Sequence, residues 1–225
     1  MREVTPVSGA EIRRAFKCLE KAFGERRWRR GRPALDQLIA TILSQNTNDR
    51  NSSRGFERLR ERFGSWDRVA AARRADIERA IRVAGLARVK SGRIKALLRD
   101  LRRRHGAYSI EFLRRMPDAE AMAYLCDMPG VGPKTAACVL LFSFGKPVFP
   151  VDTHIYRVAK RLGWVPDKAD RVRAQALLHE IVPGEIVYPL HLLLIALGRR
   201  VCHARHPEHA ACPLRAMCPS AGFVL

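Results

Sequence analysis

Apolar residues recur at helical spacing along almost the whole chain, and this periodicity constrains the fold more than any other feature of the sequence. The pattern appears at positions 35–43, 94–101 and 155–162, each time placing the apolar residues on one face. No run alternates apolar and polar residues as a half-buried strand does. Glycines divide the chain into predicted helices of roughly ten to fifteen residues. These glycines are Gly64, Gly85, Gly106, Gly130, Gly145 and Gly163. The sequence therefore predicts an all-α protein.

Charge limits the partners that such a chain would have. Its 225 residues include 42 lysines and arginines against 22 acids, a formal net charge of +20. This excess favours a polyanionic partner, although an acidic protein, a membrane surface or simply arginine-rich helix faces are the alternatives. No apolar run approaches the roughly 20 residues of a membrane span. We therefore expect a cytoplasmic protein with no membrane partner, which would be associated with the nucleoid where the polyanion is DNA. We also expect it to be a monomer.

One segment, residues 129–135, separates two predicted helices at 119–127 and 135–144. It reads PGVGPKT, and its two glycines permit a tight turn with outward-facing backbone N–H groups. The positive end of the second helix would lie beside them, which suits a phosphate. The segment has the helix-hairpin-helix pattern of proteins that bind the DNA backbone. The alternative is an ordinary glycine turn. The predicted DNA contacts are Gly130, Val131, Gly132 and Thr135.

Lys134 opens the second of these helices. A lysine in the first turn of a helix opposes the macrodipole and is a poor structural choice there. A nucleophile needs a free amine in such a place. The sequence therefore suggests a nucleophilic lysine, with a phosphate contact as the alternative.

Asp152 precedes the predicted helix at 155–162. An aspartate in that position is most simply an N-cap. Cleavage of a glycosidic bond, however, develops positive charge on the sugar, which a carboxylate stabilises while it accepts the lysine proton. In the mechanism that this pair suggests, a damaged nucleotide is flipped into a pocket and the Lys134 amine attacks C1′ as the base leaves. The Schiff base that results then permits β-elimination of the 3′ phosphate.

The six cysteines do not suggest a disulfide framework in a reducing compartment. Three of them, Cys202, Cys212 and Cys218, lie within the last 24 residues, a spacing typical of a metal site. The others, Cys18, Cys126 and Cys138, occur in apolar helical patterns and are expected to be buried free thiols.

The segment MPGVGPKTAACVLLFSFGKPVFPVDTHIYRV closely resembles the hairpin-to-aspartate region of the endonuclease III family. The resemblance extends from LDQLIATILSQNTND, which begins at Leu35, to the terminal cysteines. It implies a two-domain, all-helical DNA glycosylase with DNA bound in the cleft between the domains. A six-helix domain would comprise residues 33–146, and a discontinuous iron-sulfur domain would comprise residues 1–32 and 147–225.

The resemblance also implies roles for individual residues. Lys134 matches the family's nucleophile and Asp152 its catalytic aspartate, and the lysine favours the bifunctional branch with both glycosylase and lyase activity. Leu86, after Gly85, resembles a leucine that wedges into the duplex. Gln45 and Asn46 resemble polar residues that fill the space left by the flipped base. Alternatively, Leu86 is a core residue and the two amides cap a helix or bond to backbone.

In the family, four terminal cysteines with six, two and five residues between them hold a 4Fe-4S cluster. In this chain Cys202, Cys212 and Cys218 occupy three of the places and His209 occupies the second. Imidazole ligation occurs in other iron-sulfur centres. These four residues are therefore the expected ligands, with a three-iron cluster or zinc as alternatives and His203 and His206 nearby. Arg205 would lie in the resulting basic loop and contact phosphate or solvent.

The leading functional prediction is a base-excision-repair enzyme that removes oxidised pyrimidines from double-stranded DNA and cleaves abasic sites. A uracil or thymine mismatch glycosylase of the same fold is an alternative, because residues of the pocket select the base. Cys126 replaces the acidic residue common in relatives at this place, which makes the substrate harder to predict. A non-catalytic helix-hairpin-helix protein, with Lys134 on a phosphate and Asp152 as a cap, is the alternative from another class.

Overall fold

The computed structural model describes residues 7–29 and 31–222, and every regular element among them is helical. The all-α prediction is therefore confirmed. The chain forms two compact units, one of residues 31–144 and the other of residues 7–29 with 145–222. All six glycines that were expected to separate helices have positive φ.

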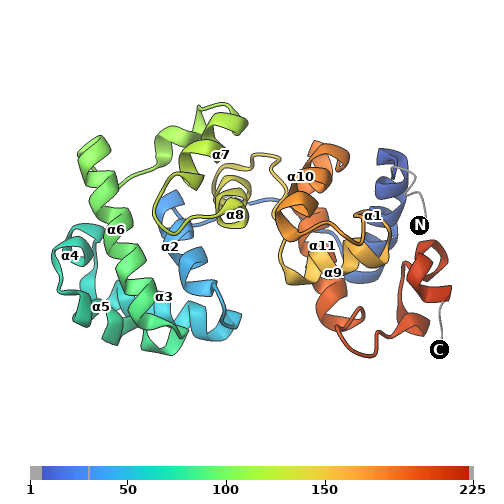
Figure 1. Cartoon of the computed structure of the whole chain (residues 1–225), viewed down its shortest axis with the longest axis horizontal. Coiled ribbons are helices and arrows are strands. Elements are labelled where there is room, and N and C mark those ends of the chain that lie inside the picture. Colours follow the sequence, from blue (N-terminus) through green and yellow to red (C-terminus); the bar gives the residue numbers. More distant parts are fainter. Residues whose placement is uncertain (1–6, 30, 223–225) are drawn as a thin grey trace. The chain divides into compact units, whose positions relative to one another are not determined.

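The unit of residues 31–144 is built around α2 (Ala34–Ser44), which packs against α8 (Pro133–Phe144), α3 (Asp49–Phe63) and α6 (Ala87–His105) (Figure 1). Seven of the eleven residues of α2 are buried, and Leu38, Ile39 and Ile42 are fully enclosed. The apolar face seen in the sequence is therefore the core of this unit, because a helix surrounded by others must bury nearly all of its surface.

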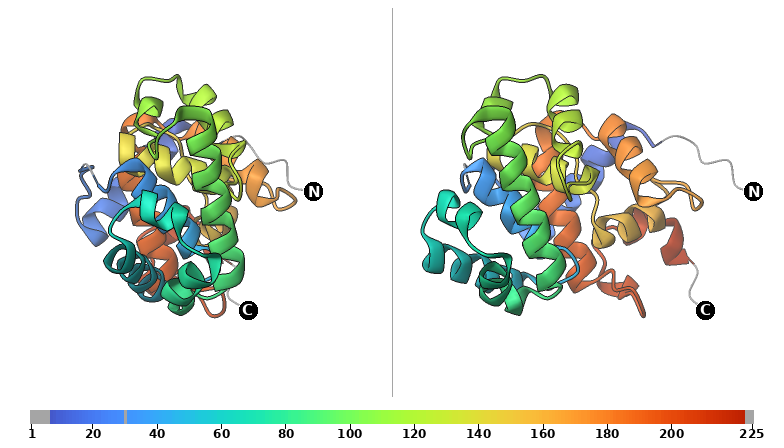
Figure 2. Two further views of the ribbon diagram at one scale, coloured as in Figure 1. Left: turned by 90° about the vertical axis from the view of Figure 1, so that its left-hand side faces the viewer. Right: turned by 60° about the vertical axis from the view of Figure 1, so that its left-hand side comes forward.

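The remaining elements of this unit cover the core. They are α4 (Trp66–Ala71), α5 (Arg74–Ile81), the 3₁₀ turn η1 (Arg82–Ala84), the 3₁₀ turn η2 (Glu111–Arg114) and α7 (Asp118–Cys126). Figure 2 shows α6, in green, as one uninterrupted helix. It begins beside Leu86 and ends at Gly106, which adopts a left-handed φ of 68° as the C-cap.

The second unit contains α1 (Gly9–Phe23), α9 (Thr153–Arg161), α10 (Arg171–Ile181) and α11 (Val187–Arg200). Both α1 and α9 pack against α11. The short turns η3 (Gly184–Ile186), η4 (His209–Ala211), η5 (Arg215–Met217) and η6 (Pro219–Gly222) complete it.

Side-chain caps fix where several helices begin. Ser8, Asn48 and Ser65 each accept a hydrogen bond from the backbone N–H three residues later, at the starts of α1, α3 and α4.

No single helix of the described chain is long and apolar enough to cross a membrane. The segments 171–181 and 184–200 are together long and apolar enough to do so, but the chain bends by 116° between them.

Candidate functional site

The predicted hairpin lies between α7 and α8. The second helix begins at Pro133, two residues earlier than the sequence suggested, so that Lys134 is its second residue. Proline is well placed there because its fixed φ suits the first turn and its missing N–H would have had no helical acceptor. Gly130 adopts a φ of 77°, which confirms the tight turn, whereas Gly132 is not in the left-handed region.

The hairpin leaves a group of backbone donors unused. In the described part of the chain, the N–H groups of Gly130, Gly132, Lys134 and Thr135 have no acceptor. The N–H of Val131 is different, because it donates to the carbonyl of Met128 at 3.2 Å. The unused donors lie at the positive end of α8, so the segment is suited to bind an anion such as a phosphate.

Lys134 is half-buried at this end of α8. Its Nζ forms neither a hydrogen bond nor an ion pair with any residue that the structure describes. A lysine held at a helix N-terminus without a carboxylate partner gains nothing for stability from its charge. It does offer an uncommitted amine to a bound anion or to an electrophilic carbon.

Asp152 lies in the other unit, at the start of α9. Its Oδ1 accepts a hydrogen bond from the backbone N–H of Ile155 at 2.8 Å, so the expected N-cap is confirmed. Its Oδ2 has no hydrogen-bond partner among the described residues. One oxygen therefore fixes the orientation of the carboxylate, and the other is available to a ligand.

Gln45 links the end of α2 to the hairpin. Its Nε2 donates to Thr135 Oγ1 at 3.3 Å and lies 3.5 Å from the carbonyl oxygen of Gly130. Its Oε1 accepts a hydrogen bond from Arg93 Nη1 at 2.6 Å. The amide thus bonds within the protein, as the alternative interpretation allowed, and it holds the Gln45 side chain against the hairpin one residue from Lys134.

Asn46 and Leu86 are exposed, and both have left-handed backbones, with φ values of 53° and 48°. The Leu86 side chain is 54% exposed, so the interpretation of Leu86 as a core residue is wrong. A left-handed leucine is strained, because its Cβ crowds the backbone, and such strain is concentrated at functional sites. Leu86 therefore presents an apolar side chain to solvent at the start of α6.

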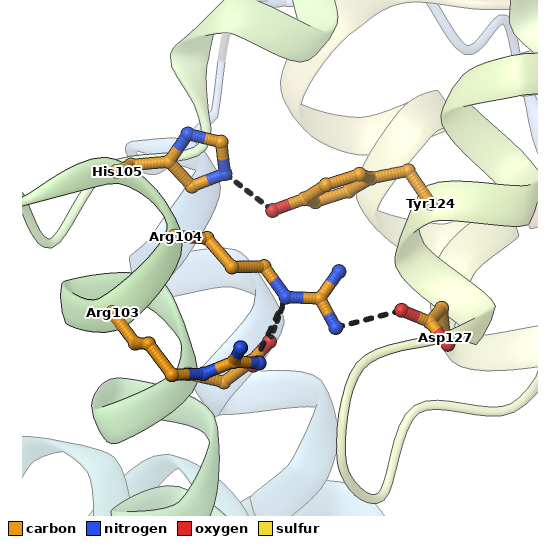
Figure 3. A network of polar contacts seen from close by, with 6 residues as sticks. Arg103, Arg104, His105, Tyr124 and Asp127 are labelled. Atoms are coloured by element: carbon orange, nitrogen blue, oxygen red, sulfur yellow. Dashed lines mark hydrogen bonds and ion pairs between the residues drawn. The ribbon is translucent and has the colours of Figure 1, made fainter.

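A polar network holds α7, which leads into the hairpin, against the end of α6 (Figure 3). The Arg104 guanidinium lies between Asp100 and Asp127, with Nη2 donating to Asp127 Oδ2 at 2.7 Å and Nε 2.8 Å from Asp100 Oδ2. These two carboxylates raise the pKa of Arg104 further above its ordinary value, Asp127 contributing most. His105 Nε2 and the Tyr124 hydroxyl form a second contact at 2.6 Å. Because Asp127 is the C-cap of α7, this network fixes the first residue of the turn.

The three terminal cysteines lie close enough to influence one another. Burial raises the pKa of the Cys212 thiol, and the nearby Cys218 and Cys202 raise it further. Burial likewise raises the pKa of Cys218. Within residues 7–29 and 31–222, no three Cys, His, Asp or Glu side chains are close enough together for a single metal ion. A four-iron cluster differs from a single ion because each of its ligands binds a different iron, and three thiols with one imidazole are a suitable donor set for it.

Arg161 of α9 fixes the tail that carries these cysteines. Its Nη1 donates to Cys202 Sγ at 3.2 Å and to the carbonyl of His203 at 2.6 Å. The Cys218 thiol donates to the carbonyl of Arg161 at 3.4 Å. His209 is half-buried in η4, and Arg205 is exposed. The helix that Asp152 caps is therefore also the support of the cysteine-rich tail.

The remaining cysteines differ from the prediction of three buried thiols. Cys138 is buried, but Cys18 and Cys126 are only half-buried. Cys126 lies in the last turn of α7, where burial raises the pKa of its thiol.

Several residues that organise the site were missed in the sequence. Arg93, Arg104 and Arg161 act through partners that are 48, 23 and 41 residues away. In a chain with 42 basic residues, nothing local distinguishes an arginine that bridges two elements from one on a solvated face. Asp100, four residues before Arg104, was the one available signal, because this spacing favours an ion pair on a helix.

We expect Gly130→Ala to lower the free energy of unfolding by about 1–2 kcal/mol, because a left-handed φ is unfavourable for a residue with a Cβ. The new Cβ would also lie 2.8 Å from Cδ of Arg93 and displace the side chain that holds Gln45. Affinity for duplex DNA should fall as well. Urea denaturation and fluorescence anisotropy measure the two effects.

The matched control for that substitution is Gly132→Ala. No atom lies within 4 Å of a Cβ at Gly132, and its φ is not left-handed, so the free energy of unfolding should hardly change. Equal destabilisation by the two alanines would contradict the role assigned to the Gly130 turn.

Comparison with known proteins identifies the family. Residues 39–184 match the model of the HhH-GPD superfamily base excision DNA repair proteins. The chain is 42% identical over 165 residues to an Arabidopsis thaliana protein named as a DNA glycosylase. This alignment covers 73% of this chain and 56% of the plant protein. It is 34% identical over 181 residues to endonuclease III of Thermotoga maritima, covering 80% of each protein.

The fold agrees with that of a solved relative over nearly its whole length. A trapped covalent intermediate of endonuclease III with DNA superimposes with a TM-score of 0.81 and 29% identity, covering 96% of this chain and 98% of the other. The helical architecture, the hairpin with its unused donors and the matched sequence segments agree with one another. The chain belongs to the endonuclease III family within the HhH-GPD superfamily of base excision DNA repair proteins.

Proposed function

We propose that this protein is a bifunctional DNA N-glycosylase and abasic-site lyase that removes oxidised pyrimidines from double-stranded DNA as a monomer. The observation that carries the proposal is Lys134, whose amine has no protein partner in the described structure and adjoins a hairpin with unused backbone donors. The covalent intermediate that was trapped in a solved relative supports a nucleophilic mechanism.

In the proposed reaction, the hairpin N–H groups bind the DNA backbone while the damaged nucleotide leaves the stack. The Lys134 amine forms a bond to C1′ as the bond from C1′ to the base breaks, and the base departs with that electron pair and takes up a proton. Asp152 accepts the proton that the amine loses and stabilises the positive charge on the sugar. Its capped Oδ1 keeps the carboxylate in one orientation.

The lyase step follows from the same adduct. Opening of the sugar at the bond between C1′ and O4′ leaves a protonated Schiff base on Lys134 and a hydroxyl at O4′. Loss of a proton from C2′ then expels the 3′ phosphate by breaking the bond between C3′ and oxygen. Water hydrolyses the imine and restores the free lysine.

A panel of duplexes with single lesions tests the proposal. It should include an oxidised pyrimidine, uracil opposite guanine, a thymine mismatch and an abasic site, each with and without borohydride. We expect the fastest base release from the oxidised pyrimidine and a covalent adduct with it and with the abasic duplex. Preference for uracil or mismatched thymine would overturn the substrate class. The absence of an adduct from a folded, DNA-binding protein would overturn the lyase.

We also propose that Cys202, His209, Cys212 and Cys218 hold a 4Fe-4S cluster, as the endonuclease III family generally does. The cluster would supply a rigid cross-link for a tail with little apolar area of its own. Arg161 supports this assignment because it anchors Cys202 and Cys218 from α9. The exposed Arg205 would then project from a fixed loop toward phosphate.

His209→Ala should lower the bound iron and inorganic sulfide and the visible absorbance. His209→Cys should retain them with a lower reduction potential, because an imidazole ligand raises the potential relative to thiolate. His206→Ala is the matched control, since His206 is exposed on the same tail. Stoichiometric zinc in a colourless wild type, or an unchanged iron content in His209→Ala, would contradict the ligand set.

A further inference from the structure

Lys90 is the largest fully enclosed side chain among the described residues, and only 1% of it is exposed. Lysine is almost never buried without a partner, because its charge is costly to remove from water. Its Nζ donates to two backbone carbonyls, that of Leu43 at 2.7 Å and that of Ala84 at 2.8 Å. Burial, with the nearby charge of Arg93, lowers its pKa to about 8. Lys90 is enclosed too completely to reach a substrate, so its role must be sought in the two carbonyls.

These two carbonyls precede the two exposed segments at which the backbone is strained. Leu43 is the penultimate residue of α2 and is followed by the segment that carries Gln45 and Asn46. Ala84 ends η1 and is followed directly by Gly85 and Leu86. Left-handed backbones such as those of Asn46 and Leu86 persist only where the surroundings fix them. Lys90 provides one fixed point at the base of both segments.

The neighbouring elements keep this fixed point rigid. Ala84 lies so close to Gly55 of α3 that a Cβ on the glycine would be 2.9 Å from the Cβ of Ala84. One turn beyond Lys90 on α6, Arg93 donates to Gln45 and packs against Gly130 of the hairpin. Successive turns of α6 therefore contact three of the segments to which DNA contacts were assigned, namely the end of α2, the turn before Leu86 and the hairpin.

We propose that Lys90 is a positioning residue, which holds the Gln45–Asn46 segment and Leu86 at a fixed separation so that both enter a damaged duplex together. This inference rests on the proposed function. Leu86, which would wedge into the duplex, and the Gln45–Asn46 segment, which would fill the space left by the flipped base, act on the same base pair. Ordering both before binding removes the entropy cost of arranging them while the nucleotide leaves the stack. The carbonyl partners are backbone atoms, so the sequence at residues 43 and 84 can vary without loss of this link.

Lys90→Met removes the ammonium but keeps the length and apolar stem of the side chain. We expect single-turnover release of a paired, oxidised pyrimidine to slow about tenfold more than cleavage of a preformed abasic site, because an abasic nucleotide has no base to unstack. Lys95→Met is the matched control, since Lys95 is on the same helix and donates to the carbonyl of Ala72. It should slow both reactions equally, by less than about twofold.

A double-mutant cycle with Leu86→Ala tests whether Lys90 acts through the wedge. Leu86→Ala should slow base release about tenfold in the wild type and less than about twofold in Lys90→Met. Additive effects, or equal slowing on the two substrates, would overturn the proposal. If Lys90→Met does not fold, Lys90→Gln, which keeps an N–H donor, takes its place in the cycle.

Hydrogen exchange separates this inference from the proposed function. Amides at residues 44–47 and 85–87 should exchange faster in Lys90→Met than in the wild type, whereas those near Ala72 should not. If the wild type neither traps nor excises, the proposed function fails and the exchange result alone decides the role of Lys90. Unchanged exchange rates in both segments would overturn the positioning role of Lys90.

Discussion

Lys134→Gln is expected to abolish the borohydride-trapped adduct and to lower single-turnover base release by at least about a thousandfold, the scale typical of losing a nucleophile. The glutamine keeps most of the stem of the half-buried side chain but has no basic amine. Lys90 cannot replace it, because only 1% of Lys90 is exposed. Gel analysis of the trapped complex and rapid-quench measurement of base release check both expectations.

Two further properties of this variant separate a nucleophile from a phosphate contact. The midpoint of thermal unfolding should be unchanged, since Nζ of Lys134 bonds to no described residue. DNA affinity should fall only as far as in Lys168→Gln, which removes the same charge from an exposed position. A persistent adduct in Lys134→Gln, with a reduced salt dependence of binding, would instead assign Lys134 to a phosphate.

Asp152→Asn is expected to lower base release about a hundredfold or more, within the range that general acid–base catalysis contributes. Asparagine caps helices as well as aspartate does, so the bond from the Ile155 N–H is retained. The free energy of unfolding should therefore remain within about 0.5 kcal/mol of the wild type. Chemical denaturation and single-turnover kinetics on the same preparation give the two values.

The chain contains a matched control for this substitution. Asp170 caps α10 with the same geometry, its Oδ1 accepting from the Arg173 N–H at 2.8 Å. Asp170→Asn should leave base release unchanged. Full activity in a folded Asp152→Asn variant would show that Asp152 is only a cap.

Much of the candidate site could be predicted because its geometry is local. The Gly130 turn and the Asp152 cap each depend on residues within a few positions of one another. Even the error in the start of α8 was confined to two residues, because a proline inside a glycine-rich string can end a loop or begin a helix. The exposed side chain of Leu86 was less predictable, since a leucine that follows a glycine can lie in a core as well as on the surface.

The sequence by itself determined the helical pattern, the cap at Asp152 and the hairpin, because backbone propensity and side-chain chemistry act over short spans. Only the tertiary structure decided which of the many basic residues link the elements around the hairpin and Leu86. Lys90 meets a carbonyl 47 residues away, and Arg104 meets Asp127 across two helices. A buried cation is stable only where packing places acceptors around it, and packing is a property of the folded chain rather than of any segment.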